Sequence, residues 1–213
     1  MNNSSVFDES YFARCYASYR KQNPRYKSAQ ILSLIKQYRE RGNLLDIGCG
    51  LGLFLRAAKA EGYNVHGCDI SAFAVSRCLD EIPTQCCSMA DLPYENSCFD
   101  VVTVLDVIEH VSDLWKGIRE VKRVARRDAI VVFLIPVYDG IVGRIVGRLD
   151  KDATHVNKLS RFRWIEVLKK EFDVMEWTGA FRYFFFKSIY LHFHSAVLRK
   201  WAPAIIVVGR NRI

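Results

Sequence analysis

The chain has 213 residues, a formal net charge of +8 and a hydrophobic fraction of 50%. This length predicts one well-buried core and is short for two domains. The longest apolar run, near residues 130–137, is far too short to span a bilayer. Seven cysteines without zinc-type spacing indicate reduced thiols in a cytoplasmic protein, and the polar N-terminus predicts no signal peptide.

Residues 1–43 precede the first predicted strand, and we expect them to form an N-terminal helical cap. Ile31, Leu34, Ile35 and Tyr38 recur at the spacing of one helical face. This periodicity predicts a helix over Ser28–Glu40.

A glycine-rich turn follows the first predicted strand, 44–47. Asp46 lies in that strand, and Gly48, Gly50 and Gly52 then occupy alternate positions before an apolar helix start. A backbone without Cβ atoms lets a ligand lie directly against it, and the N-terminus of the helix offers free N–H groups. The carboxylate of Asp46 can accept a hydrogen bond from such a ligand. Dehydrogenases use a similar turn, but their third glycine comes one residue later.

This stretch resembles the first motif of class I S-adenosylmethionine-dependent methyltransferases, D-x-G-x-G-x-G. The resemblance implies a Rossmann-like fold that binds S-adenosylmethionine and releases S-adenosylhomocysteine. It assigns Asp46, Gly48, Cys49 and Gly50 to cofactor binding.

Two further acids follow predicted strands at fitting positions. Asp69 ends the strand 63–68, about twenty residues beyond the glycines, where a carboxylate can accept from both ribose hydroxyls. It could instead serve only as a helix-capping acid. The resemblance makes Asp91, after the strand 84–87, the acceptor for the adenine amino group. The neighbouring Ile70 and Leu92 are also predicted to bind cofactor.

The run 99–111 begins as a β-branched apolar strand and then becomes acidic. It resembles the F-D-x-V…E-H-V block of the methyltransferase subgroup that includes ubiquinone-type O-methyltransferases. Leu105 and Asp106 complete the predicted cofactor site, and His110 is a candidate base. The resemblance also allows Asp106, Glu109 and His110 to bind a divalent ion, although our prediction is that no metal is used.

Helices and strands alternate along the chain, which predicts a parallel sheet with right-handed crossovers. The family resemblance implies seven strands in the order 3-2-1-4-5-7-6, the last one antiparallel. Relatives carry a Pro-Gly-Gly turn where this chain has residues 124–128, and we expect a longer helix end there. We predict a single domain with a cap (1–43), a cofactor-binding core (44–137) and a substrate side (138–213). The remaining predicted strands are 128–135, 172–177 and 204–208.

Charge is unevenly distributed. Residues 1–43 carry 8 basic and 3 acidic groups, residues 44–110 carry 3 and 10, and residues 111–213 carry 20 and 10. The acidic middle suits a sulfonium cofactor. The basic flanks suit an anionic acceptor or a membrane surface, or are simply solvated helix faces, and nothing resembles a nucleic-acid recognition module.

The C-terminal third carries the predicted acceptor side. His155 lies in a loop after the fifth strand and is, with His110, a candidate base for hydroxyl methylation. The insert 181–203 is aromatic; Phe181, Phe184, Phe185 and Ile189 begin one predicted helical face. That helix is read as core-facing, or as a lid over a lipophilic acceptor, or as a peripheral membrane contact. The segment Tyr11–Arg20 is expected to cover the cofactor.

Small-molecule methylation, most simply O-methylation, is the main interpretation. The chain lacks the Asn/Asp-Pro-Pro-aromatic motif of base-amine methyltransferases and the Pro-Cys of cytosine C5 enzymes. A catalytically silent cofactor-binding module is one alternative. A short-chain NAD(P) oxidoreductase is another, because Tyr183 and Lys187 fit Tyr-x-x-x-Lys. The acceptor and the oligomeric state stay open at this point.

Overall fold

The computed structural model describes residues 7–15, 19–78, 80–149, 152–185 and 189–212. None of the described helices is long and apolar enough to cross a membrane. The elements in chain order are α1 (Glu9–Cys15), α2 (Tyr19–Gln22), α3 (Arg25–Lys36), β1 (Asn43–Ile47), α4 (Leu53–Ala60), β2 (Asn64–Asp69), α5 (Ala72–Val75), β3 (Thr84–Cys86), β4 (Phe99–Leu105), the 3₁₀ turn η2 (Ile108–His110), α6 (Leu114–Val124), β5 (Ala125–Pro136), α7 (Gly140–Leu149), α8 (Arg161–Lys169), β6 (Phe172–Phe185), β7 (Ile189–Ser195) and β8 (Ala204–Asn211).

One sheet organises the chain. Its eight strands follow the order β3-β2-β1-β4-β5-β8-β6-β7. The strands β1 to β5 are parallel to their neighbours, and β8 runs antiparallel between β5 and β6. The predicted order is confirmed for the seven expected strands, and β7 is an additional edge strand.

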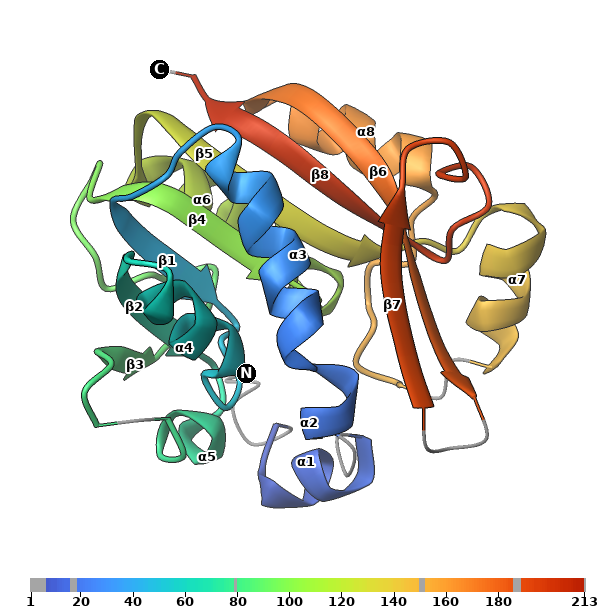
Figure 1. Cartoon of the computed structure of the whole chain (residues 1–213), viewed down its shortest axis with the longest axis horizontal. Helices are drawn as coiled ribbons and strands as arrows, with labels where there is room; N and C mark the ends of the chain where they lie inside the picture. The colour runs from blue at the N-terminus through green and yellow to red at the C-terminus, as the bar shows by residue number, and fades with distance from the viewer. Residues whose placement is uncertain (1–6, 16–18, 79, 150–151, 186–188, 213) are drawn as a thin grey trace.

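Both faces of the sheet are covered. Successive residues of a strand point to opposite faces, so Leu44 packs in the layer of α3 and α4, whereas Leu45 packs in the layer of α6 and α8. In Figure 1, α3 and α4 lie in front of the sheet, and α6 and α8 lie behind it. Burial on both faces explains why the central strands are nearly continuous apolar runs.

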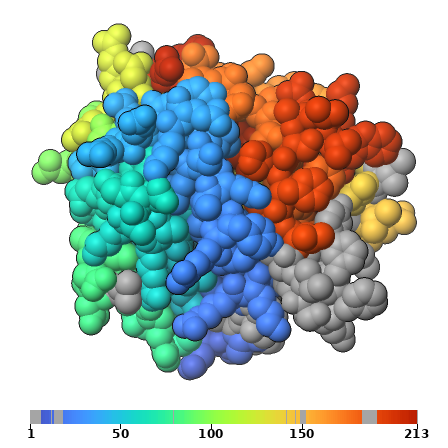
Figure 2. All heavy atoms as spheres, viewed as in Figure 1, coloured from blue at the N-terminus to red at the C-terminus, as the bar shows by residue number. Residues whose placement is uncertain are grey.

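The N-terminal helices lie near the carboxyl ends of the parallel strands. Figure 2 shows the N-terminal segments, with α3, running down the middle of one face between the early strands and the C-terminal strands. Helix α3 begins at Arg25, directly after an extended Pro24, and ends at Lys36. It therefore starts and ends earlier than the predicted helix 28–40.

The insert 181–203 corrects one prediction. It contains no helix in its described residues; β6 continues to Phe185 and pairs antiparallel with β7. The rings of Phe181 and Phe193, cross-strand partners, stack 4.8 Å apart. Aromatic residues gain such cross-strand contacts in a sheet, and β6 already runs beside β8 where the insert begins. A helical spacing of aromatics was therefore misleading.

The segment 124–128 is also different from the prediction. Helix α6 ends at Val124, and β5 begins at Ala125, so no longer helix end forms. The register with β4 jumps from Phe99–Ala125 to Val101–Ile130, and Asp128 has a φ of 60°. The extra residues bulge out of the strand, which replaces the expected turn.

Candidate functional site

The turn between β1 and α4 exposes its backbone because two glycines hold left-handed conformations. Gly48 has a φ of 75° and Gly50 a φ of 51°. A Cβ on Gly48 would lie 2.1 Å from Val107 Cγ2, and one on Gly50 would lie 2.2 Å from Tyr19 Oη. Any side chain at either position would therefore be strained and would clash.

This turn forms one wall of a cavity of about 610 Å³. The cavity lies at the carboxyl ends of β1, β2 and β4, where ligands bind in open α/β sheets. Its size is that of a small-molecule site. Ten of the predicted site residues line it: Asp46, Gly48, Cys49, Gly50, Asp69, Ile70, Leu105, Asp106, His110 and His155.

Two predicted cofactor residues lie elsewhere. Asp91 is exposed, and Leu92 is buried in the core behind the sheet. Neither lines the cavity, whereas their neighbours Met89 and Ala90 do. The adenine role of Asp91 stays a prediction.

Asp69 fastens the glycine turn to β2. Its carboxylate accepts from the backbone N–H of Gly50 at 2.8 Å and from that of Ser71 at 2.9 Å. Burial raises the pKa of Asp69, although these N–H donors counteract the shift. The helix-capping contact is made by Ser71 Oγ, which accepts from Ala74 N. Asp69 therefore shapes the turn as well as lining the cavity.

Asp46 is the most deeply buried acid at this end, with 2% of its surface exposed. Thr103 Oγ1 donates to its carboxylate at 2.6 Å. Burial raises the pKa of Asp46 to about 7, against the lowering effect of that hydrogen bond. A cation bound beside Asp46 would offset this desolvation cost.

Asp106, directly after β4, forms a partly buried ion-pair cluster. Arg182 of β6 donates to it at 2.6 Å, and Lys27 Nζ of α3 lies 3.6 Å from its other oxygen. Burial raises the pKa of Asp106, but the charges of Arg182 and Lys27 outweigh burial and hold it below its ordinary value. Asp106 also has a φ of 58°, which is uncommon outside glycine.

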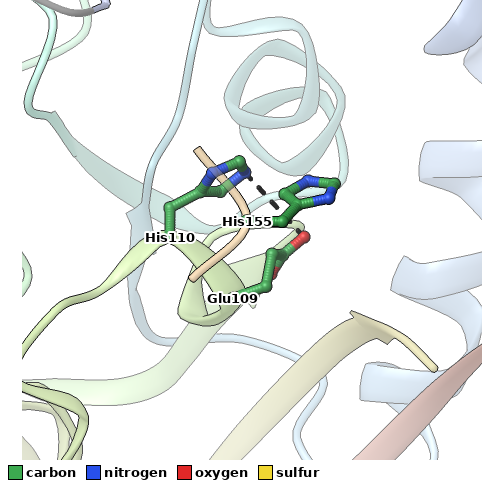
Figure 3. A group of neighbouring side chains, drawn as sticks. All are labelled: Glu109, His110 and His155. Atoms are coloured by element: carbon green, nitrogen blue, oxygen red, sulfur yellow. Dashed lines mark ion pairs between the residues drawn. The ribbon is translucent and has the colours of Figure 1, made fainter. Parts of the chain in front are cut away.

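This cluster bears on the metal alternative. Asp106 does not join Glu109 and His110 in a common donor set. Among the described residues, the potential metal-binding group consists of Glu109, His110 and His155, whose donor atoms lie within 4.8 Å of one another (Figure 3). Asp106, which pairs with Arg182 and Lys27, is therefore not in this group, unlike in the metal alternative that the resemblance allows.

The two candidate bases lie together, although 44 residues separate them in sequence. The ring centroids of His110 and His155 are 4.6 Å apart. Burial, followed by the neighbouring His155, lowers the pKa of His110 to about 4. Glu109 beside them is buried, and this burial raises the pKa of its carboxyl well above the ordinary value. His110 is therefore neutral near pH 7, and burial favours the protonated form of Glu109.

Hydrogen bonds orient both rings. Thr154 Oγ1 donates to Asp152 and lies 2.8 Å from His110 Nδ1. Its hydroxyl proton is used on Asp152, so His110 Nδ1–H donates to Thr154 and Nε2 keeps a lone pair. His155 Nδ1 lies 2.8 Å from Tyr138 Oη. Both rings are thus fixed by side chains that the sequence did not single out.

The loop that carries His155 is tied to the end of β4. Asn157 Nδ2 donates to the carbonyl oxygens of Ile108 at 3.1 Å and Val111 at 2.7 Å. The backbone N–H groups of Val156 and Asn157 both donate to the Glu109 carbonyl. These bonds explain why His155 meets His110. The signal available in the sequence was only the short stretch T-H-V-N.

The N-terminal segment lies against the same cavity. Phe7, Tyr11 and Tyr19 line it. Tyr11 Oη donates to Asp152 at 2.9 Å, and the Phe7 ring meets the His110 ring edge-on. Of the segment predicted to cover the cofactor, residues 16–18 lie outside the described residues.

Comparisons with known proteins agree with this geometry. The methyltransferase domain family matches residues 45–133. Norajmaline N-methyltransferase of Rauvolfia serpentina is 36% identical over 102 residues, which are 43% of this chain and 35% of that protein. The 27-O-demethylrifamycin SV methyltransferase of Amycolatopsis mediterranei is 37% identical over 93 residues, 39% of this chain and 34% of that protein. The match thus spans about a third of these relatives.

A solved structure extends the likeness to nearly the whole chain. An S-adenosylmethionine-dependent methyltransferase from Thermotoga maritima superposes with a TM-score of 0.69 at 16% identity and covers 94% of this chain and 98% of its own. At that identity the likeness concerns the fold alone. Residues 45–133 of this chain thus match the methyltransferase domain family, and the glycine turn, with Asp46 in β1 and Asp69 at the end of β2, agrees with that match.

Proposed function

We propose that this protein transfers a methyl group from S-adenosylmethionine to a hydroxyl oxygen of a small apolar acceptor that carries an anionic group. The observation that carries the proposal is the pair His110 and His155, which lies in the same cavity as the glycine turn. The glycine turn and the two histidines therefore line one cavity, which supports a shared site for cofactor and acceptor.

The cavity fits this cofactor at its first end. Gly48 and Gly50 line the cavity without a Cβ, so a ligand can lie directly against their backbone. The buried carboxylate of Asp46 and the half-buried carboxylate of Asp69 suit its ammonium and sulfonium charges and its ribose hydroxyls. When bound, the cofactor supplies an electrophilic methyl group on a positively charged sulfur.

The chain then has to align the acceptor and remove its proton. His155 is the proposed base: if Tyr138 accepts from its Nδ1–H, Nε2 carries the lone pair that takes the hydroxyl proton. His110, which is neutral and fixed by Thr154, packs beside His155 and places no positive charge next to it. No metal is needed for this route.

The acceptor end favours an anion. Lys27 and Arg182 bring two positive charges against the single negative charge of Asp106, and all three line the cavity. Burial also raises the pKa of the nearby Glu109 carboxyl, which disfavours a second negative charge beside this cluster. A carboxylate or phosphate on the acceptor would complete it.

The test is a panel of hydroxylated aromatic and aliphatic carboxylic acids, their methyl esters, and the matching amines, incubated with S-adenosylmethionine. We expect methyl ethers of the free acids, detected by mass spectrometry, with weaker turnover of the esters. Arg182→Gln should raise KM for the acids and leave KM for the esters nearly unchanged. Methylation of the amines alone would overturn the hydroxyl assignment.

Two other functions are weaker. A silent cofactor-binding module would bind S-adenosylmethionine without turning over any acceptor of the panel. The oxidoreductase alternative has less support, because Tyr183 lies in β6, within a hairpin, and Lys187 lies outside the described residues.

A further inference from the structure

The loop between β7 and β8 exposes large apolar side chains. Val197 is 89% exposed, Trp201 58% and Leu198 46%. Buried apolar side chains stabilise a fold, whereas neighbouring exposed ones usually mark an interaction surface.

This loop is held firmly on the protein. Arg161, which is 2% exposed, donates to the carbonyl oxygens of Arg199 and Ala202. The same guanidinium binds both carboxylate oxygens of Asp139, at 3.1 and 3.0 Å. Arg161 therefore joins the loop to the residue that precedes α7. The exposed side chains are presented by an anchored loop.

Helix α7 adds to this surface. An ideal Cβ on Gly140 lies 3.8 Å from the Lys200 carbonyl, so the helix begins beside the loop, at the same end of the sheet (Figure 1). Gly143 and Gly147 face Tyr138. Arg144, Ile145 and Arg148 are exposed, with 52% for Ile145. We call the exposed residues Arg144, Ile145, Arg148, Val197, Leu198, Lys200 and Trp201 the basic–apolar face.

The charge of this face selects its partner. Residues 140–149 and 196–203 contain four basic residues and no acidic one. The adjacent Asp139 is neutralised by Arg161. A second copy of a chain with a net charge of +8 would bring like charges together. An anionic bilayer offers negative headgroups for the arginines and an apolar interior for Val197 and Trp201.

We propose that the basic–apolar face docks this protein on an anionic lipid bilayer. The side chains of Val197, Leu198 and Trp201 enter the headgroup boundary, and Arg144, Arg148 and Lys200 pair with lipid phosphates. The contact is peripheral. It differs from the expected contact through a helix over 181–203, because the loop 196–203 presents the apolar side chains and that segment forms no helix in its described residues. It does not depend on methyl transfer.

The experiment is co-sedimentation of the full chain with phosphatidylcholine vesicles, with and without phosphatidylglycerol. We expect binding to the anionic vesicles, weakened by salt, and little binding to the zwitterionic ones. Val197→Glu and Arg144→Glu should each lower the partition coefficient at least about fivefold, since one surface charge contributes about 1 kcal/mol near an anionic membrane. The fluorescence of Trp201 should shift to the blue on binding, and Trp201→Phe should remove that shift.

Two matched controls keep the test specific. Arg127→Glu changes an arginine that is 76% exposed, and Tyr38→Ser changes an aromatic residue that is 36% exposed. Both residues lie outside the basic–apolar face. Loss of the aromatic ring in Tyr38→Ser and reversal of the charge in Arg127→Glu should each reduce vesicle binding less than the face variants do. Equal binding of Val197→Glu and the parent would overturn the proposal. So would a dimer in sedimentation equilibrium that Val197→Glu dissociates, because the face would then join two copies.

Discussion

The two ends of the cavity are built differently. The proposed cofactor end is made of the glycine turn, whose backbone lines the cavity, and of Asp46 in β1 and Asp69 at the end of the parallel strand β2. The acceptor end is made of side chains from α3, η2, the loop 152–157 and β6, which are far apart in sequence. A site formed by backbone is disrupted by substitutions that add atoms. A site formed by side chains is disrupted by substitutions that remove functional groups. The predictions below exploit that difference.

The largest effect is expected at the glycine turn. Gly50→Val should abolish cofactor binding, because a branched side chain would be strained at a φ of 51° and would meet Tyr19 Oη. Calorimetry with S-adenosylmethionine measures the loss. Leu51→Ala, in the same turn but outside the cavity lining, serves as the control and should bind within about threefold of the parent. Unchanged affinity of Gly50→Val would place the cofactor elsewhere.

Removal of an acid from the same end should have a smaller effect. Asp69→Ala should weaken cofactor binding by roughly 2–4 kcal/mol, because two charge-assisted hydrogen bonds to the ribose would be lost. Asp91→Ala is the variant to compare with Asp69→Ala. The exposed position of Asp91 predicts little change, whereas an adenine-binding role predicts a clear loss. Asp69→Ala within about twofold of the parent would contradict the ribose contact.

At the acceptor end, a lost group should change rate and leave affinity for the cofactor alone. His155→Ala should lower kcat by about 100-fold or more if this ring is the base. His194→Ala, an exposed histidine on β7, is the matched control and should keep full activity. Steady-state kinetics and calorimetry together separate the two quantities. Normal kcat in His155→Ala would leave alignment and desolvation as the source of rate.

The smallest expected effect is on the pH dependence of cofactor binding. Asp46 has a pKa near 7 in the free protein, so its charge appears as pH rises from 6 to 8. Affinity for the cationic cofactor should rise about tenfold over that range. The folded state binds this proton more tightly than the unfolded state, so the contribution of Asp46 to the free energy of unfolding falls as pH rises from 3.8 to about 7. Asp46→Asn should flatten the binding profile, and an unchanged slope would assign it to another group.

The sequence alone determined most of the sheet and the cofactor end. Residues 44–47 and 99–105 are apolar runs that are buried on both faces, and this pattern is local. The glycine turn is equally local, because its conformation depends on the absence of Cβ atoms at Gly48 and Gly50. These features were predicted because each depends on residues that lie close together in the chain.

The acceptor end was decided by the tertiary structure. Lys27 and Arg182 meet Asp106 only because α3 and β6 cross the end of β4, and Asn157 brings His155 to His110. The hairpin β6–β7 was missed because the same aromatic residues fit one face of a helix and also form pairs across two strands. Local spacing cannot report contacts between segments that lie far apart in the sequence. Those contacts depend on how the sheet and its covering helices pack.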